Sequence, residues 1–302
     1  MADRILALGF FDGVHIGHAA LLRRTVELAN SGEYSPAVLS FDTHPASVVL
    51  GKPIPLLCDF DARRYIIARD FDIHDMVKIH FEERMRRMSW QDFAAGMRDE
   101  FHAAGVVVGD DFRFGFKGGG TAELLRQFCA DNGLICDVIP RVSLDGVTVS
   151  SSFIRELVAE GDLERARDYL GHPHLLISRV ISGHGIGRSM GAPTINMQIP
   201  DGVVIPRFGV YATRVTLPDG SRYIGVTNVG VRPTVSGGQA EQPISIETFI
   251  MDFEGDLYGE LVVLEFEKFM RPELKLSGLE ELSRQIARDA EGAREYFAVR
   301  GM

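Results

Sequence analysis

The sequence predicts an α/β domain followed by a β domain: a doubly wound parallel sheet with helices, and then a small antiparallel β-barrel with a C-terminal helix. In the first half, short apolar runs alternate with helical patterns, as in parallel strands joined by crossover helices. In the second half, short alternating runs are separated by Gly, Pro and Asp, and one long helical pattern follows them. The change near residue 171 predicts domains at 1–173 and 174–302.

Composition narrows the class of protein. The chain has 302 residues, 45% of them hydrophobic and 25% charged, which is ordinary for a globular protein of about two domains. Its formal charge of −10 argues against nonspecific binding of nucleic acid. No apolar run approaches the roughly 20 residues that span a bilayer, and because the sequence goes directly into a short strand we expect no signal peptide. We therefore expect a cytoplasmic enzyme of small molecules; a homo-oligomer is compatible with the sequence.

The cysteines give no sign of a disulfide framework or a zinc site. Cys58, Cys129 and Cys136 are scattered and form no C-x-x-C pair. This pattern therefore argues against a disulfide framework and against a zinc site.

The elements of the first half follow in order. We expect strands at 5–8, 37–41, 76–79, 105–108 and 134–139, helices at 18–30, 90–103 and 121–131, and then two short helices that end at Gly171. The carboxyl ends of parallel strands lie at one edge of the sheet, where ligands bind. The loops after residues 8, 41 and 108 are expected at that edge.

The loop after the first strand is the strongest candidate for a site. Gly9, Gly13 and Gly17 permit close approach of the backbone to a ligand, and the following helix N-terminus suits phosphate. His15 and His18 could donate to a polyphosphate whose charge grows as a bond breaks. The alternative is a pair of surface or capping histidines at a glycine turn. Their place after a first strand favours the functional interpretation.

Two further stretches of the first half are candidate binding segments. The loop 109–120 combines carboxylates, cations, glycines and the rings of Phe112 and Phe114, which could hold a planar heterocycle; a solvated loop is the alternative. Serines at 150–152 precede Arg155, and together they could bind ATP phosphates, although serines before a helix are also ordinary N-caps. The segment 42–45 is weaker, because a turn explains it equally well.

These stretches resemble the N-terminal half of bacterial FAD synthetase, the family of bifunctional riboflavin kinase/FMN adenylyltransferases. The matching motifs are the H-x-G-H nucleotidyltransferase signature at His15–His18, G-D-D-F-R-F-G at 109–115 and S-S-S-x-I-R at 150–155. Phe10 stands where the family commonly has Asn, and Ser152 stands where it commonly has Thr.

The resemblance implies adenylyl transfer from ATP to FMN. It implies that His15, His18 and Arg155 stabilise the α-phosphate and the departing pyrophosphate. The implied ATP-binding residues are Gly9, Phe11, Asp12, Gly17, Ser150, Ser151 and Ser152. The implied flavin-binding residues are Asp111, Phe112 and Phe114.

The pattern of the second half predicts several short strands followed by one helix. The strands are expected at 176–181, 209–215, 223–227, 244–251 and 261–266, and the helix at 279–297. Thr194 and Asn196 lie on one side of an extended segment, and their oxygens suit Mg²⁺ with ATP; a structural turn is the alternative. Glu247 interrupts an apolar strand, either as part of a solvent face or as a base. There is no P-loop motif, so a P-loop kinase is excluded.

This half resembles the riboflavin kinase part of the same family. The matching motifs are P-T-x-N at 193–196, G-x-R-P-T at 230–234 and R-P-E-L-K at 271–275. By this resemblance Thr194 and Asn196 would bind Mg²⁺ with ATP, and Glu247 would be the base. Binding of ATP or flavin is implied for Gly187, Pro193, Arg232 and Arg271. Phe249 stands where His is common, and Leu276 where Phe is common.

The expected function is FAD synthesis in two steps, with Mg²⁺ and ATP, from riboflavin through FMN to FAD. One alternative is that only one activity remains, and Phe10 makes the adenylyltransferase the weaker candidate. A flavin-binding regulator is another, and a nucleotidyltransferase of a different phosphate ester is a third. The intact candidate transfer groups argue against a regulator, and the kinase-like second half argues against another substrate.

Overall fold

The computed structural model describes residues 3–182, 194–231, 244–275 and 277–301. The chain divides into two compact units. The first comprises Met1–Leu56 and Phe60–Phe153, and the second comprises Leu57–Asp59 and Ile154–Met302. The domain limits at 173 and 174 stay a prediction.

The first unit contains the expected parallel sheet. Its strands are β1 (Arg4–Leu8), β2 (Ser35–Phe41), β3 (Asp75–Ile79), β4 (Ala103–Gly109) and β7 (Ile135–Ile139). They are ordered β3-β2-β1-β4-β7, and every neighbouring pair is parallel. The strand order reverses between β1 and β4, and ligands of such sheets bind at the carboxyl ends beside this reversal. The doubly wound sheet is confirmed.

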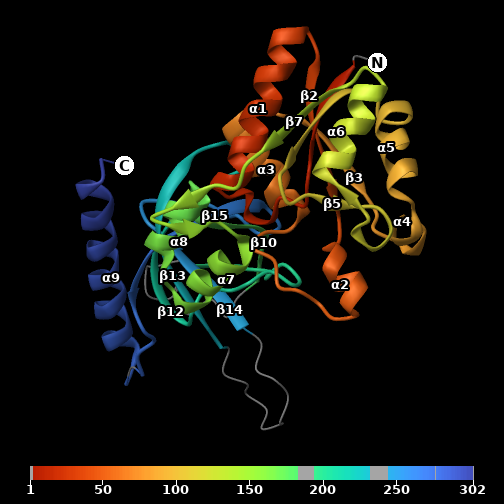
Figure 1. Ribbon diagram of the computed structural model, residues 1–302. Helices are drawn as coiled ribbons and strands as arrows, with labels where there is room; N and C mark the ends of the chain where they lie inside the picture. Colours follow the sequence, from red (N-terminus) through yellow and green to blue (C-terminus); the bar gives the residue numbers. More distant parts are fainter. Residues whose placement is uncertain (1–2, 183–193, 232–243, 276, 302) are drawn as a thin grey trace. The chain divides into compact units, whose positions relative to one another are not determined.

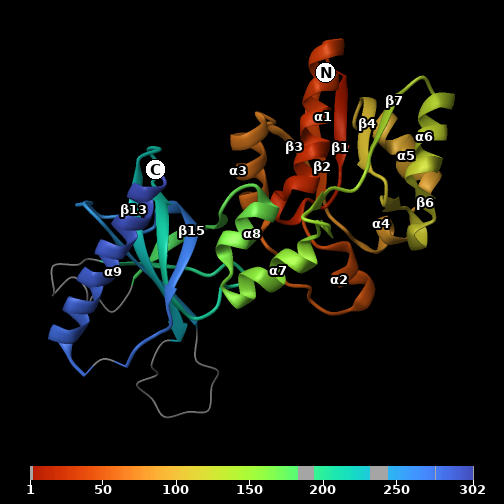
Figure 2. The ribbon, with the colours of Figure 1, turned by 60° about the vertical axis from the view of Figure 1, so that its left-hand side comes forward.

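Helices cover both faces of this sheet (Figure 2). On one face lie α1 (Ile16–Gly32) and α3 (Phe60–Phe71), and on the other lie α5 (Trp90–Asp99) and α6 (Ala122–Asp131). The second face forms a core from alternate strand residues and apolar residues of α5 and α6. The helix predicted at 90–103 is shorter in the structure, because residue 103 already begins β4.

The connections of this unit are more structured than the sequence indicated. Three helices were not expected: α2 (Pro45–Leu50), α4 (Glu83–Arg87) and α3. The remaining short elements are η1 (Asp12–Val14), β5 (Arg113–Phe114), η2 (Phe116–Gly118), β6 (Gly120–Thr121), β8 (Ser143–Leu144) and β9 (Val147–Thr148). The stretch 109–120 is thus a small folded hairpin with a turn.

The second unit contains a closed barrel, and every neighbouring pair of its strands is antiparallel. Its strands, in barrel order, are β10 (His174–Ile181), β11 (Thr194–Met197), β14 (Ile244–Ile250), β13 (Arg222–Val231), β12 (Gly209–Thr216) and β15 (Leu261–Arg271). The expected pair of short helices is α7 (Ser151–Glu160) and α8 (Leu163–Leu170), and the chain closes with α9 (Leu279–Val299). The barrel and the C-terminal helix are confirmed.

The two faces of the barrel wall differ. Thr213, Thr227 and Thr248 form a fully buried chain of hydroxyl hydrogen bonds of 2.8 and 2.9 Å on the inner face. On the outer face, α9 lies along β12 and β13 (Figure 1), and its Ala293 and Phe297 pack in one core with residues of those strands. Because side chains alternate along a strand, each polar residue of the wall is assigned to one face by its register.

Candidate functional sites

The loop after β1 has a constrained backbone. Phe11 has φ of 57° and Val14 has φ of 43°, values that L-residues, and β-branched ones above all, rarely adopt. Both side chains are about 1% exposed, so packing holds this conformation. A Cβ at Gly9 would lie 3.1 Å from the Phe11 ring, and one at Gly17 would lie 3.1 Å from the His15 ring. The glycines therefore let these rings pack against the backbone.

The two histidines of this loop meet at the start of α1. His15 is the N-cap, and its Nδ1 accepts a hydrogen bond of 3.2 Å from the backbone N–H of His18. The two imidazole rings are stacked, with centroids 3.6 Å apart and planes 10° from parallel. The Phe11 ring contacts His18 edge-on at 5.2 Å. His15 is therefore a capping histidine, as the structural alternative proposed. The same cap places the ring of His18 beside that of His15.

The environment of His18 favours the neutral ring. Burial is the main cause that lowers its pKa well below 6.5, and the charges of His15 and Arg63 act in the same direction. Its Nδ1 is buried and has no hydrogen-bond partner among the described residues. A buried nitrogen of this kind is a hydrogen-bonding position that the described residues leave unsatisfied. An anion bound here would raise the pKa again.

The serine run begins α7 and contacts the same loop. Ser151 Oγ donates a hydrogen bond of 3.1 Å to the carbonyl of Asp12, whose side chain is buried. Ser150 Oγ accepts one of 3.4 Å from the N–H of Phe153, as an N-cap does. Ser152 follows within the helix, and Arg155 lies one turn beyond Ser151. The structure therefore brings the serines to the β1 loop.

The residues predicted at the loop after β4 have two different environments. Phe114 is a core residue, with ring contacts to Trp90 at 6.4 Å and to Phe93 at 5.4 Å. Phe112 stacks on Phe114 at 5.4 Å and is only partly buried. Asp111 is exposed, and its carboxylate lies 3.6 Å from Arg141. Asp111 and Phe112 are thus the accessible members of this set.

The loop after β2 contains one polar pair and one cap. Burial opposes the ionisation of Asp42, but hydrogen bonds from the His80 ring and from backbone N–H groups outweigh it and lower the pKa of Asp42. His44 caps α2 by accepting a hydrogen bond of 3.1 Å from the N–H of Ala46. Capping of α2 therefore explains the position of His44 without a role in ligand binding.

Sequence reasoning missed Arg63, which is 0% exposed in α3. Its guanidinium donates to the carbonyl of Phe10, and at 2.9 and 3.0 Å to Ser40 Oγ and the carbonyl of Phe41. It also lies 4.2 Å from the centroid of the Phe10 ring. No signal in the sequence separates it from Arg64, which is exposed and lies near Asp61.

In the barrel, three polar residues stand side by side on neighbouring strands. Asn196 of β11 is opposite Glu247 of β14, and Glu247 is opposite Asn228 of β13. Directly opposite residues share a face, so all three lie on the outer face that α9 also covers. Thr194 is two residues from Asn196 and lies on the same face. Sequence reasoning missed Asn228.

The end of β15 adds charged groups to this face. Glu273 accepts a hydrogen bond of 3.2 Å from Asn228 Nδ2. Arg271 forms a two-pronged ion pair with Asp289 of α9, with Nε–Oδ1 at 2.9 Å and Nη2–Oδ2 at 2.7 Å. Asp289 was not identified from the sequence. Gly187, Pro193, Arg232 and Leu276 lie outside the described residues.

The oxygens of this face fit a hard divalent cation. Thr194 supplies a hydroxyl oxygen and Asn196, 4% exposed, supplies an amide oxygen. Within the described part of the chain, no group of three or more His, Cys, Asp or Glu could hold a metal. Mg²⁺ is commonly bound by a few protein oxygens and completes its coordination with oxygens of substrate phosphates and water.

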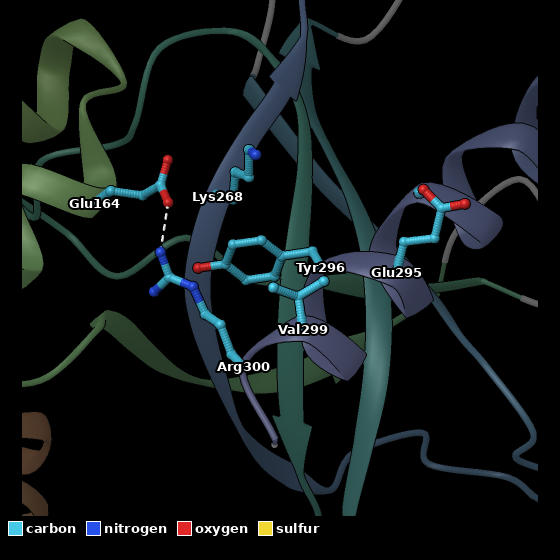
Figure 3. A pocket seen from close by; sticks show the side chains of 7 residues that line it. Glu164, Lys268, Glu295, Tyr296, Val299 and Arg300 are labelled. Carbon is cyan, nitrogen blue, oxygen red and sulfur yellow. Dashed lines mark hydrogen bonds and ion pairs between the residues drawn. The ribbon is translucent and has the colours of Figure 1, made fainter.

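A separate hollow of about 360 Å³ lies between α8, β15 and α9 (Figure 3). Arg300 crosses it, paired with Glu164 at 2.7 Å and placed 4.7 Å from the centroid of the Tyr296 ring. Tyr296 donates a hydrogen bond of 3.3 Å to the carbonyl of Glu267. The cations that line the hollow thus already have partners within the protein. We therefore assign the hollow a packing role.

Comparisons with known proteins cover both units. The chain matches the family model described as FAD synthetase over residues 1–153, and the one described as riboflavin kinase over residues 170–297. It is 33% identical over 298 residues to the bifunctional riboflavin kinase/FMN adenylyltransferase of Listeria monocytogenes, which covers 98% of this chain and 93% of the relative. The protein of the same name from Haemophilus influenzae is 33% identical over 97% of this chain and 94% of its own.

One solved structure also covers both units. It is a crystal structure described as a macrolide-efflux protein from Streptococcus pneumoniae, with a TM-score of 0.81, 26% identity and coverage of 97% of this chain and 94% of that one. In the described residues of the present chain, no helix is long and apolar enough to cross a membrane.

Proposed function

Because the chain belongs to the family of bifunctional riboflavin kinase/FMN adenylyltransferases, we propose that its two reactions take place at the two candidate sites described above. The enzyme phosphorylates riboflavin with ATP to give FMN. It then transfers AMP from ATP to FMN, which gives FAD and pyrophosphate.

The kinase reaction is proposed for the outer face of the barrel. Glu247 stands between Asn196 and Asn228 in register, and this arrangement is the observation that supports the assignment. Glu247 accepts the proton of the riboflavin 5′-hydroxyl as that oxygen attacks the γ-phosphorus of ATP. ADP leaves with the displaced oxygen. Arg271, held by Asp289, orients the flavin, and Gly187, Pro193 and Arg232 contribute to binding ATP or flavin.

Mg²⁺ is proposed at Thr194 and Asn196, whose oxygens suit it. When bound, it neutralises charge on the ATP phosphates. Substituting Asn196 by Ala should raise the Mg²⁺ concentration for half-maximal kinase activity by at least about tenfold, a loss of roughly 1.4 kcal/mol in metal binding. An unchanged Mg²⁺ dependence would remove this ligand from the proposal.

Adenylyl transfer is proposed for the carboxyl edge of the parallel sheet. The stacked rings of His15 and His18 and the unsatisfied Nδ1 of His18 support this assignment. The FMN phosphate is already an ionised nucleophile and attacks the α-phosphorus, and pyrophosphate leaves. His15, His18 and Arg155 stabilise the charge that develops on the phosphates.

Substrate binding completes this site. Gly9, Gly17, Phe11, Asp12 and the serines 150–152 are proposed to hold ATP. Asp111 and Phe112 are proposed to contact the flavin directly. Phe114, which lies in the core, supports Phe112 from behind.

The experiment uses two incubations, one with riboflavin, ATP and Mg²⁺ and one with FMN, ATP and Mg²⁺, and separates the products by chromatography. The wild type should give FAD in both. His18→Asn should give FMN but no FAD, and Glu247→Gln should give FAD only from supplied FMN. Glu254→Gln, at an exposed carboxylate, is the control and should behave as the wild type. FAD formation by His18→Asn, or FMN formation by Glu247→Gln, would overturn the corresponding assignment.

The cellular setting is also proposed. A cytoplasmic location fits an ATP-dependent enzyme with three free cysteines. The net charge of −10 favours small-molecule substrates over nucleic acid as partners. Size-exclusion chromatography with light scattering would determine whether the chain forms a homo-oligomer.

A further inference from the structure

Arg63 occupies an unusual position for a charged side chain. It is 0% exposed, and it comes from α3, a helix in which no candidate site residue was identified from the sequence. Arginine is almost never fully buried unless its donors are used. Here they bind the carbonyls of Phe10 and Phe41 and the hydroxyl of Ser40.

These acceptors belong to the ends of two neighbouring strands. Phe10 is the second residue after β1, and Ser40 and Phe41 are the last residues of β2. Ser40 Oγ donates a further hydrogen bond of 3.1 Å to the same Phe10 carbonyl. The guanidinium therefore joins the carboxyl ends of β1 and β2 at the edge where adenylyl transfer is proposed.

The Phe10 ring gives the guanidinium a second attachment. The centroid of this ring lies 4.2 Å from Arg63 Cζ, within the range of a cation–π contact, and the ring of Phe60 lies 5.2 Å away. His44 contacts the Phe10 ring edge-on at 4.6 Å. Phe10, which departs from the common Asn of the family, thus packs on Arg63.

We propose that Arg63 is a positioning residue for adenylyl transfer, which fixes the backbone of Phe10 and thereby the loop that carries His15 and His18. The next residue, Phe11, has the left-handed backbone conformation, and its buried ring contacts His18. A loop held in such a conformation needs external support. Small displacements of catalytic groups cost up to about 10²-fold in rate.

The charge of Arg63 also acts on His18. Burial is the largest cause of the low pKa of His18, and the charges of His15 and Arg63 come after it. Replacing Arg63 by a neutral residue of similar length should therefore raise the pKa of His18, because it removes a positive charge that opposes protonation of the ring. The pKa change reports the charge of Arg63, whereas a loss of kcat with little change in KM, partly restored by lysine, reports positioning.

The test compares Arg63→Met and Arg63→Lys with Arg64→Met, the matched control at the exposed neighbour. We expect Arg63→Met to lower kcat of adenylyl transfer by about 10- to 100-fold, with a smaller change in KM for FMN and with riboflavin phosphorylation unchanged. Arg63→Lys should recover part of kcat, because it keeps the charge but not the planar donors. In Arg63→Met the pKa of His18, followed by NMR, should rise.

Phe10→Leu provides a second, independent variant. If the ring acts through Arg63, this substitution should lower kcat in the wild type and have little further effect when combined with Arg63→Met. If Arg63→Met does not fold, the kcat values of Arg63→Lys and Phe10→Leu test the positioning role instead. Wild-type kcat in both of them, or in a folded Arg63→Met, would overturn the inference.

The inference rests on the proposed location of adenylyl transfer, and the two can fail separately. His18→Asn tests the location in the same assay. Full activity of His18→Asn would reject the location, whereas loss in His18→Asn with wild-type kcat in the Arg63 variants would reject only the role of Arg63.

Discussion

The imidazole rings of His15 and His18 lie face to face, 3.6 Å apart, because the first caps the helix on whose first turn the second stands. The cap and the proposed phosphate contact thus share one residue. A single substitution at His15 affects both stability and chemistry, unless the replacement can still cap.

Asparagine at position 15 should separate these roles. Asn is a good N-cap and Ala a poor one, so His15→Ala should lower the free energy of unfolding of the first unit by about 1 kcal/mol and His15→Asn by much less. Both should lower adenylyl transfer by about 10²-fold or more. Urea unfolding and FAD formation measure the two effects. Equal stability of the two variants would show that the cap contributes little.

Phe112 and Phe114 should differ although they are two residues apart. Phe114→Ala should cost about 3–5 kcal/mol of stability, because it empties part of the core between Trp90 and Phe93. Phe112→Ala should cost less and instead raise KM for FMN. Thermal unfolding and steady-state kinetics distinguish them. A large loss of stability without a change in KM for Phe112→Ala would assign this ring to packing alone.

The Arg271–Asp289 pair should matter for riboflavin phosphorylation and for the attachment of α9. Asp289→Asn removes the charge that holds a mostly buried guanidinium, and it should cost about 1–3 kcal/mol of stability. KM for riboflavin should rise, while adenylyl transfer to supplied FMN stays unchanged. Asp252→Asn is the matched control: its pair with Arg294 of α9 is exposed and should contribute under about 1 kcal/mol. Equal effects in both would contradict the prediction.

His174 should make the barrel less stable in acid. Burial lowers its pKa from 6.5 to about 3, the charge of His172 adds to this, and a backbone hydrogen bond with Val204 opposes it. Between these two pH values the unfolded chain binds the proton and the folded chain does not. The free energy of unfolding therefore falls as pH falls through this range, by about 1.4 kcal/mol per pH unit for one such group.

Substitution of His174 by Phe should remove that part of the pH dependence, since the ring stacks on Phe266 and needs no proton. Denaturant unfolding at pH 7, 6, 5 and 4 measures the slope. His74→Gln, at an exposed histidine, is the control and should keep the wild-type slope. An unchanged slope in His174→Phe would show that other groups determine the acid sensitivity.

Much of the architecture could be predicted because it depends on local patterns. Apolar runs alternating with helical segments specified the parallel sheet, and turn-separated short strands specified the barrel. The loop with His15 and His18 was placed at the carboxyl edge because every loop that directly follows a strand of a parallel sheet lies there. The strand β11 was described from the sequence only as an extended segment, because its four residues are too few to show the alternation of apolar and polar side chains that identifies a strand.

The sequence by itself therefore determined the two-part fold, the family and the main candidate residues. Only the tertiary structure decided which residues support them. The sequence does not distinguish Arg63 from its neighbour Arg64, and only the fold buries Arg63 at the ends of β1 and β2. Asn228 becomes a candidate because it lies opposite Glu247. Asp289 becomes one because it pairs with Arg271. The physical reason is that burial, register and ion pairing of a polar side chain depend on elements far away in the sequence, whereas helix and strand patterns depend on the residues nearby.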